Sequence, residues 1–473
     1  MATLPLHPLP VDDYPKRVSS APARNRSQGS PRLPREVRRR HDREILALAV
    51  PAFGALVAEP LFVMADSAIV GHLGTRQLAG LGVAASLLTT AVNVFVFLAY
   101  ATTAAVARRI GAGDRQAAIR QGMDGIWLAL LLSAVVVAVV VPGAGPLAEL
   151  FGASGRATGY AVTYLRISAL GIPAMLVVLA ATGVLRGLQD TRTPLVVAVA
   201  GFAANAGLNV GLVYGAGLGI AGSAWGTVIA QWAMAAAYLT VVVRGARRHG
   251  ARLRPDAAGI RACATAGVPL LVRTLSLRAI LMVATAVAAR LGDTEIAAHQ
   301  VLLTLWSLLA FALDAIAIAG QAIIGRYLGA EDAAGARAAC RRMVQWGIAS
   351  GVVLGALVAV ARPWFIPLFT GDPAVRAQLM TALLVVAVTQ PVSGVVFILD
   401  GVLMGAGDGR YLAWAMLGTL AVFVPAALAV PAIGGGLTVL WWAMALFMVS
   451  RMAFLWARAR SGHWVVTGAV RGG

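Results

Sequence analysis

Residues 108–114 of the chain read RRIGAGD and residues 326–332 read RYLGAED, so that Arg, Gly, Ala and Asp recur at matching places 218 positions apart. The offset does not change along the flanking sequence. It also joins Pro51 with Pro269, Pro173 with Pro391, and Arg192 with Arg410. A duplication this long, far beyond the period of a solenoid repeat, predicts two homologous lobes that face one another.

The composition places both lobes in a membrane. Hydrophobic residues make up 59% of the chain and charged residues 12%, and the mean hydropathy is +0.80. An apolar stretch of about 20 residues can cross the hydrocarbon core as a helix. Such stretches occur at residues 45–70, 82–107, 123–145, 158–185, 194–214, 220–243, 263–291, 296–324, 344–367, 378–404, 411–432 and 436–457. The sequence therefore predicts an all-α integral membrane protein with about twelve transmembrane helices, six in each lobe.

Basic residues gather on one side of these segments, which is the side expected to stay in the cytoplasm. They lie in the N-terminal tail and in the connections near residues 108–120, 244–261 and 326–342. We therefore expect both termini to be cytoplasmic. The predicted parts are a disordered basic tail (1–43), a first lobe (44–245), a linker (246–262), a second lobe (263–460) and a C-terminal tail (461–473). The excess of Arg over Lys, with abundant Ala and Gly, indicates a bacterial source, and we expect the protein in the inner (plasma) membrane.

Several classes of function are disfavoured. The net charge of +19 comes from short loops and a tail rich in Pro, Ser and Arg, so we expect no nucleic-acid binding. The His residues are scattered without a metal-binding pattern, and no GxxxxGK[ST] motif for ATP is found. We expect neither an enzyme nor a metal or other cofactor. The energy for any transport would then come from an ion gradient.

Four acidic residues lie more than two positions inside predicted spans, where a charge costs roughly 2.5–3.5 kcal/mol and is usually retained for function. They are Glu59, Asp66, Asp314 and Asp400. Glu59 and Asp66 are seven residues apart and share a helix face, as do Asn205 and Asn209, which are four apart. A buried carboxylate facing amides predicts a proton-coupling site. The alternatives are that Asp66 only bonds its neighbours and that Glu59 is solvated at the membrane face.

The acidic residues of the second lobe have nearby candidate partners. Arg273 and Arg278 lie at membrane depth in the seventh span, and we expect them to form a structural polar network with Asp314 and Asp400. Six large side chains are candidates for contacts in a substrate cavity, although core packing is the alternative for Met64. They are Phe62, Met64, Phe95, Tyr100, Trp225 and Trp306.

The sequence resembles a known family at several motifs. Residues 58–74 read AEPLFVMADSAIVGHLG, which is similar to the first-helix signature of the multidrug and toxic compound extrusion transporters, and of their DinF-like branch in particular. Residues 185–194 (LRGLQDTRTP) resemble the cytoplasmic turn of the family, and the turn recurs as LMGAGDGR at 403–410. Residues 217–224 (GLGIAGSA) and 297–300 (AAHQ) also match.

The resemblance implies a V-shaped pair of six-helix lobes that open alternately to each side and export organic cations in exchange for H⁺ or Na⁺. It implies that Asp66 is the protonated aspartate of the first lobe and that Asn205 is its partner. Asn209 stands where many prokaryotic members have a second aspartate. The second-lobe glutamate of Na⁺-coupled members has no counterpart between Arg273 and Arg278. We therefore expect H⁺ rather than Na⁺ as the coupling ion.

Two other classes of protein stay open at this stage. A flippase for lipid-linked sugars would need cations that line its cavity, and Arg273 and Arg278 keep that alternative available. A scaffolding membrane protein is the other, but an acidic residue in the first span has little purpose there. We expect small organic cations and the lipid bilayer as partners, and a monomer as the state of assembly.

Overall fold

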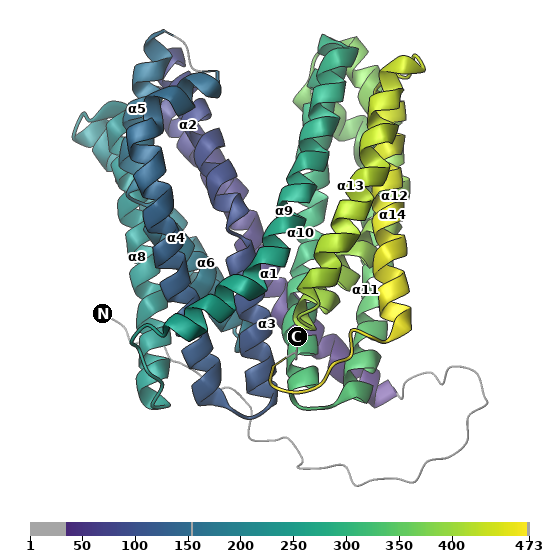
Figure 1. Cartoon of the computed structure of the whole chain (residues 1–473). Helices are drawn as coiled ribbons and strands as arrows, with labels where there is room; N and C mark the ends of the chain where they lie inside the picture. The colour runs from purple at the N-terminus through teal and green to yellow at the C-terminus, as the bar shows by residue number, and fades with distance from the viewer. Residues whose placement is uncertain (1–34, 153–154, 471–473) are drawn as a thin grey trace.

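The computed structural model describes residues 35–152 and 155–470, except for a few side chains within helices (Figure 1). The described backbone is helical and contains no strand. In chain order the helices are α1 (Arg35–Gly71), α2 (Thr75–Val94), α3 (Phe97–Gly111), α4 (Arg115–Leu150), α5 (Arg156–Ala169), α6 (Ile172–Gly187), α7 (Arg192–Val210), the π-helix η1 (Gly211–Gly215), α8 (Gly219–Arg248), α9 (Ala257–Leu291), α10 (Asp293–Gly329), α11 (Ala333–Phe369), α12 (Pro373–Gly405), α13 (Gly409–Ala432) and α14 (Leu437–Ser461).

The prediction of an all-helical membrane protein is confirmed. Among the described residues, ten helical segments are long and apolar enough to cross a membrane when α2 and α3 are counted together, and the bent pair α5–α6 raises the number to eleven. The remaining predicted span, 45–70, falls within α1. Of the predicted tail of residues 1–43, positions 1–34 lie outside the described residues, and the chain is helical from Arg35 onward.

Two of the predicted spans are interrupted. Residues 82–107 form α2 and α3, with a break at Phe95 and Val96. Residues 158–185 form α5 and α6, which meet at an angle of 50°. Pro173 lies at the start of α6, where its missing N–H is tolerated but cannot continue α5. Apolar periodicity alone does not reveal such a bend.

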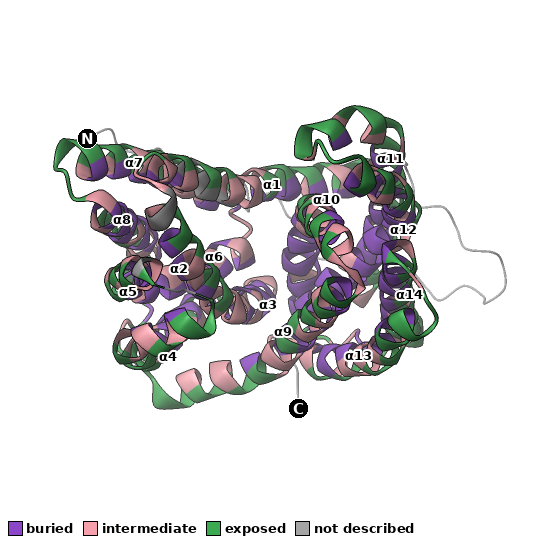
Figure 2. Cartoon of the chain, turned by 90° about the horizontal axis from the view of Figure 1, so that it is seen from above, coloured by how far each residue is buried: buried purple, intermediate pink, exposed green. Residues whose placement is uncertain are grey.

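The helices form two bundles that converge at one end and diverge toward the other (Figure 1). The bundle of α2 to α8 and the bundle of α10 to α14 correspond to the two sequence repeats, and the shape is the V that the family resemblance implies. Figure 2 shows α1 and α9 running along opposite sides between the bundles. Helix α1 packs against α10 and α7, and α9 packs against α13 as well as α3 and α4. Each of these helices therefore contacts both bundles.

The bundles meet where α3 crosses α10, and we call this the closed end. A Cβ atom added to Gly111 would lie 2.0 Å from the carbonyl oxygen of Arg326, and one added to Gly329 would lie 1.9 Å from that of Arg108. The two contacts are related by the offset of the repeat. Small residues allow this approach of two membrane helices, so the pseudo-twofold axis passes between these glycines.

Candidate functional site

The carboxylate of Asp66 is the centre of a buried polar cluster in the first lobe. Its Oδ1 accepts hydrogen bonds from Asn209 Nδ2 at 2.7 Å and from the Ser223 hydroxyl at 2.8 Å. Its Oδ2 accepts a longer bond, of 3.4 Å, from the Tyr164 hydroxyl. Asp66 is 7% exposed, Tyr164 4%, and Asn209 and Ser223 are fully buried. Four helices, α1, α5, α7 and α8, thus converge on one carboxylate.

The cluster continues behind Asn209. Its Nδ2 also donates to Asn205 Oδ1 at 2.9 Å, and Asn205 Nδ2 donates to the Thr227 hydroxyl at 3.1 Å. The spacing of four residues places both asparagines on one face of α7, as predicted from the sequence. Asn209 Oδ1 is buried and has no hydrogen-bond partner among the described residues. It faces Gly226, where an added Cβ would come within 2.1 Å.

The electrostatics of the cluster follow from its partners. The three groups that bond Asp66 are an amide and two hydroxyls, all neutral, and the structure gives Asp66 no ion pair within its described part. A buried carboxylate without a cation retains a large cost of desolvation. The arrangement is therefore suited to binding a proton or a cation, because either would neutralise the charge.

A second polar cluster lies inside the second lobe and is built differently. Both carboxylate oxygens of Asp400 on α12 accept hydrogen bonds from the guanidinium of Arg273 on α9, with 3.1 Å between Nε and Oδ1. Arg451 on α14 approaches Asp400 Oδ2 at 3.0 Å. The side chains of all three residues are less than 10% exposed. Asp400 is thus neutralised by permanent cations and has no oxygen left free for another.

The remaining two members of the predicted network lie apart from this ion pair. Asp314 on α10 is only partly buried, and the structure shows no hydrogen bond to its carboxylate among the described residues. It lies close enough to Arg186 of the first lobe, and to the three residues of the ion pair, to interact with them electrostatically. Arg278 is exposed and forms no ion pair within the described part of the chain. The network therefore contains Arg273 but not Arg278.

The other predicted site residues are dispersed. The side chains of Glu59 and Phe62 lie outside the described residues. Met64 is 68% exposed and Trp225 41% exposed, whereas Phe95, Tyr100 and Trp306 are half-buried and pack against the main core cluster. Tyr100 also lies at the contact between the lobes, where its carbonyl oxygen accepts a bond from Gln321 at 2.6 Å.

Sequence reasoning missed four residues of these clusters: Tyr164, Ser223, Thr227 and Arg451. The three hydroxyl side chains carry no signal, because Ser and Thr in a helix commonly bond their own backbone and a Tyr in an apolar helix is usually part of the packing. Arg451 did carry a signal in the sequence, since it is the only ionisable residue in the predicted span 436–457. A lone cation at that depth needs a carboxylate partner.

Comparison with known proteins bears on the family and the fold of the chain. A family model described as MatE matches residues 51–211 and 269–430, one stretch in each repeat. Protein DETOXIFICATION 44, chloroplastic, of Arabidopsis thaliana is 32% identical over 89% of this chain and 83% of its own length. DNA damage-inducible protein F of Escherichia coli (strain K12) is 31% identical over 89% and 94%. A crystal structure of MATE in the bent conformation has a TM-score of 0.82 at 21% identity, over 90% of this chain and 96% of that one.

Proposed function

Because the chain belongs to the MatE family of multi-pass membrane transporters and is not an enzyme, we propose that it exports small organic cations in exchange for protons. The observation that carries this proposal is the Asp66 carboxylate, which is buried and held only by neutral groups. The name of the plant relative, DETOXIFICATION, supports export of foreign compounds. Both termini would face the cytoplasm, as the distribution of arginine indicates.

The partners of Asp66 suit a site that gains and loses a proton. A hydroxyl donates to a carboxylate but can also accept a bond from a carboxylic acid. Ser223 and Tyr164 can therefore satisfy Asp66 in both of its states without moving far. Asn209 donates in the ionised state, and its buried Oδ1 is an unused acceptor next to the same site.

Proton coupling is favoured over sodium coupling by the same contacts. A hard cation such as Na⁺ is bound by several oxygen atoms, whereas the amide group that Asn209 turns toward Asp66 is its N–H donor. In the second lobe both oxygens of Asp400 are engaged by guanidinium groups. Binding of Na⁺ at either carboxylate would require these donors to turn away.

The coupling would operate through mutually exclusive occupation of Asp66. The ionised carboxylate favours uptake of a cationic substrate, and a proton arriving from outside neutralises it and releases the substrate. Asp66 lies on α1, which contacts α7 in one bundle and α10 in the other. A change in the packing of α1 can therefore alter its contacts with both lobes.

The test is uptake of a fluorescent organic cation into everted vesicles under an imposed pH gradient. We expect gradient-dependent uptake by the unmodified chain and its loss in Asp66→Asn. Asp293→Asn is a matched control, because Asp293 is exposed at the start of α10. The same assay with a Na⁺ gradient at equal pH separates the two coupling ions. Uptake that survives Asp66→Asn would refute this residue as the coupling site.

The flippase alternative now rests on one residue. Arg273 and Arg451 are buried on Asp400 and are not available to a diphosphate, whereas Arg278 is exposed on a helix that spans the membrane. A fluorescent lipid diphosphate in proteoliposomes tests this alternative. Translocation that requires Arg278 and ignores the pH gradient would favour the flippase.

A further inference from the structure

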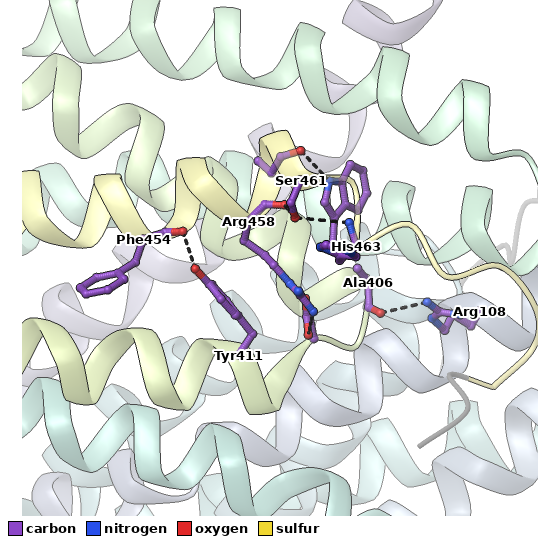
Figure 3. Close-up of polar contacts among 10 residues, drawn as sticks. Arg108, Ala406, Tyr411, Phe454, Arg458, Ser461 and His463 are labelled. Atoms are coloured by element: carbon purple, nitrogen blue, oxygen red, sulfur yellow. Dashed lines mark hydrogen bonds and ion pairs between the residues drawn. The ribbon is translucent and has the colours of Figure 1, made fainter.

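Arg108, near the end of α3, extends from the first lobe to the second. Its side chain is buried, and its guanidinium donates to the carbonyl oxygens of Ala406 at 2.9 Å, Val466 at 2.8 Å and Gly468 at 2.9 Å. Figure 3 shows the bond to Ala406, which lies in the turn between α12 and α13. Hydrogen bonds from an ionised donor are roughly twice as strong as neutral ones. One side chain thus joins α3 to two separate segments of the second lobe.

Two of these acceptors belong to residues 462–470, the segment after α14, which we call the strap. Gly462, with a φ of 72°, turns the chain at the end of α14. Trp464 is 2% exposed and donates to the carbonyl of Ala459 at 3.1 Å. The N–H of Gly468 donates to the carbonyl of Leu328 at 2.9 Å. The strap therefore runs along the closed end to the junction of the lobes (Figure 1).

Arg326 makes the corresponding contact in the opposite direction, from the second lobe to the first. It stands at the position of the second repeat that corresponds to Arg108. Its guanidinium donates to Gln189 Oε1 at 2.7 Å, in the turn between α6 and α7, and it is paired with Glu44 on α1. The turns reached by the two arginines are themselves copies of one another, related by the same offset. Each arginine therefore bonds the equivalent turn in the opposite lobe.

We propose that Arg108 and Arg326 are paired latches of the closed end, and that the strap is a lock which forms only when this end is shut. The inference rests on the proposed function in that a transporter of alternating access must open here to load from this side. The latches position the lobes and do not contact substrate. Opening must break the bonds of both arginines together with the close approach of Gly111 to the Arg326 carbonyl and of Gly329 to the Arg108 carbonyl.

The strap decides how strong the first latch is. It supplies the carbonyl oxygens of Val466 and Gly468, so its displacement removes two hydrogen bonds of Arg108. Each lost bond from a charged donor changes the ratio of open to closed molecules by roughly ten- to a hundredfold. Binding or release of the strap would therefore set how readily the closed end opens.

The test measures the distance between two spin labels across the closed end by pulsed electron resonance. The labels are attached at Arg115→Cys and Ala334→Cys, which are exposed and begin α4 and α11 in opposite lobes. The two native thiols are removed by Cys263→Ser and Cys340→Ala. The labelled chain is studied in lipid nanodiscs, without substrate or ion gradient. Failure of proton-coupled export and failure of the latch are therefore separate results.

The unmodified chain should give mainly the short distance. We expect Arg108→Gln, Arg326→Gln and Gly468→Val each to raise the long-distance population at least tenfold relative to the short one. Gly468 has a φ of 109°, which a β-branched residue cannot adopt without strain. Arg109→Gln is the matched control, because Arg109 makes no hydrogen bond or ion pair among the described residues.

The outcomes decide the proposal in either direction. Long distances in all three variants but not in the control would support both the latches and the strap. Distributions that coincide with the parent, in protein that elutes and melts as folded, would overturn it, as would a parent already dominated by the long distance. If Arg108→Gln does not fold, Arg326→Gln and Gly468→Val still decide the question.

Discussion

Replacing Asp400 by Asn should destabilise the protein strongly, whereas the same change at Asp66 should not. Asp400 is the only carboxylate bonded to two buried guanidinium groups, Arg273 and Arg451, within the described part of the chain. Asparagine keeps the shape of aspartate but loses its charge. Its amide would also direct a donor toward one of the two arginines. Both cations would then be buried without a carboxylate in contact, because Asp314 acts on them only from a longer distance.

The magnitude follows from the burial of these groups. Their side chains are 9%, 4% and 5% exposed for Arg273, Arg451 and Asp400, so little water can replace the carboxylate. Removing one partner of such a buried pair costs about 3–5 kcal/mol. The entropy of unfolding is about 2 cal/mol/K per residue. For this chain, the loss corresponds to a fall of roughly 3–5 °C in the melting temperature.

At Asp66 the same substitution has the opposite sign. Asparagine can still accept bonds from Asn209 and Ser223, and its amide can donate to the Tyr164 hydroxyl. It also removes a buried charge that has no ion pair among the described residues. We expect the melting temperature of Asp66→Asn to equal or exceed that of the parent.

The measurement is tryptophan fluorescence of the purified protein in detergent during slow heating, with both variants and the parent at one pH and one salt concentration. The comparison does not depend on activity. A melting temperature of Asp400→Asn within 1 °C of the parent would show that the ion pair contributes nothing net. A loss of equal size in both variants would show that the charge of Asp66 is compensated in a way the contacts do not reveal.

Three further predictions concern packing and pH. Gly226→Ala should abolish gradient-driven uptake, because its Cβ would displace the Asn209 amide from Asp66, while Gly207→Ala, whose Cβ meets nothing within 4 Å, should leave uptake unchanged. Gly329→Ala should shift the spin-label distance at the closed end toward the open population, because its Cβ would fall on a carbonyl oxygen of α3; an unchanged distance would contradict this. The hydrogen bond from an arginine of α11 lowers the pKa of Asp42. The stabilisation that ionised Asp42 gives the fold is therefore present at neutral pH and lost as pH falls below about 4. The difference in melting temperature between parent and Asp42→Asn should shrink from pH 6 to pH 3.

The fold could be predicted from the sequence because a membrane leaves few alternatives. Backbone polar groups must be satisfied within each apolar segment, so long apolar stretches become helices, and the repeat then fixes two lobes. The early start of α1 was not predictable in this way. Residues 35–44 are polar and read as a tail, yet Asp42 bonds Arg342 and Trp346 of α11. These contacts join parts of the chain 300 residues apart, and no local pattern reports them.

The candidate site was only partly predictable, for reasons of geometry. Asn205 and Asn209 share a face of α7 at a spacing that sequence reveals directly. Tyr164 and Ser223 come from other helices, and their approach to Asp66 depends on how the bundle packs. Arg278 could have been separated from Arg273, since five residues turn an α-helix by about 140° beyond a full turn. The two side chains therefore point to different faces of α9.

The residues that close the lobes on one another recur in both repeats, and the buried charged residues do not. The offset that joins Arg108 to Arg326 and Gly111 to Gly329 sets Asp66 against Ala284 and Asp400 against Thr182. The contacts that close the lobes on one another are therefore retained in both copies, whereas the buried charges are not. A motion that brings two lobes together needs matching surfaces on both of them. Coupling to one ion would need a buried carboxylate that no cation already pairs with, and Asp66 meets that condition among the described residues whereas Asp400 does not.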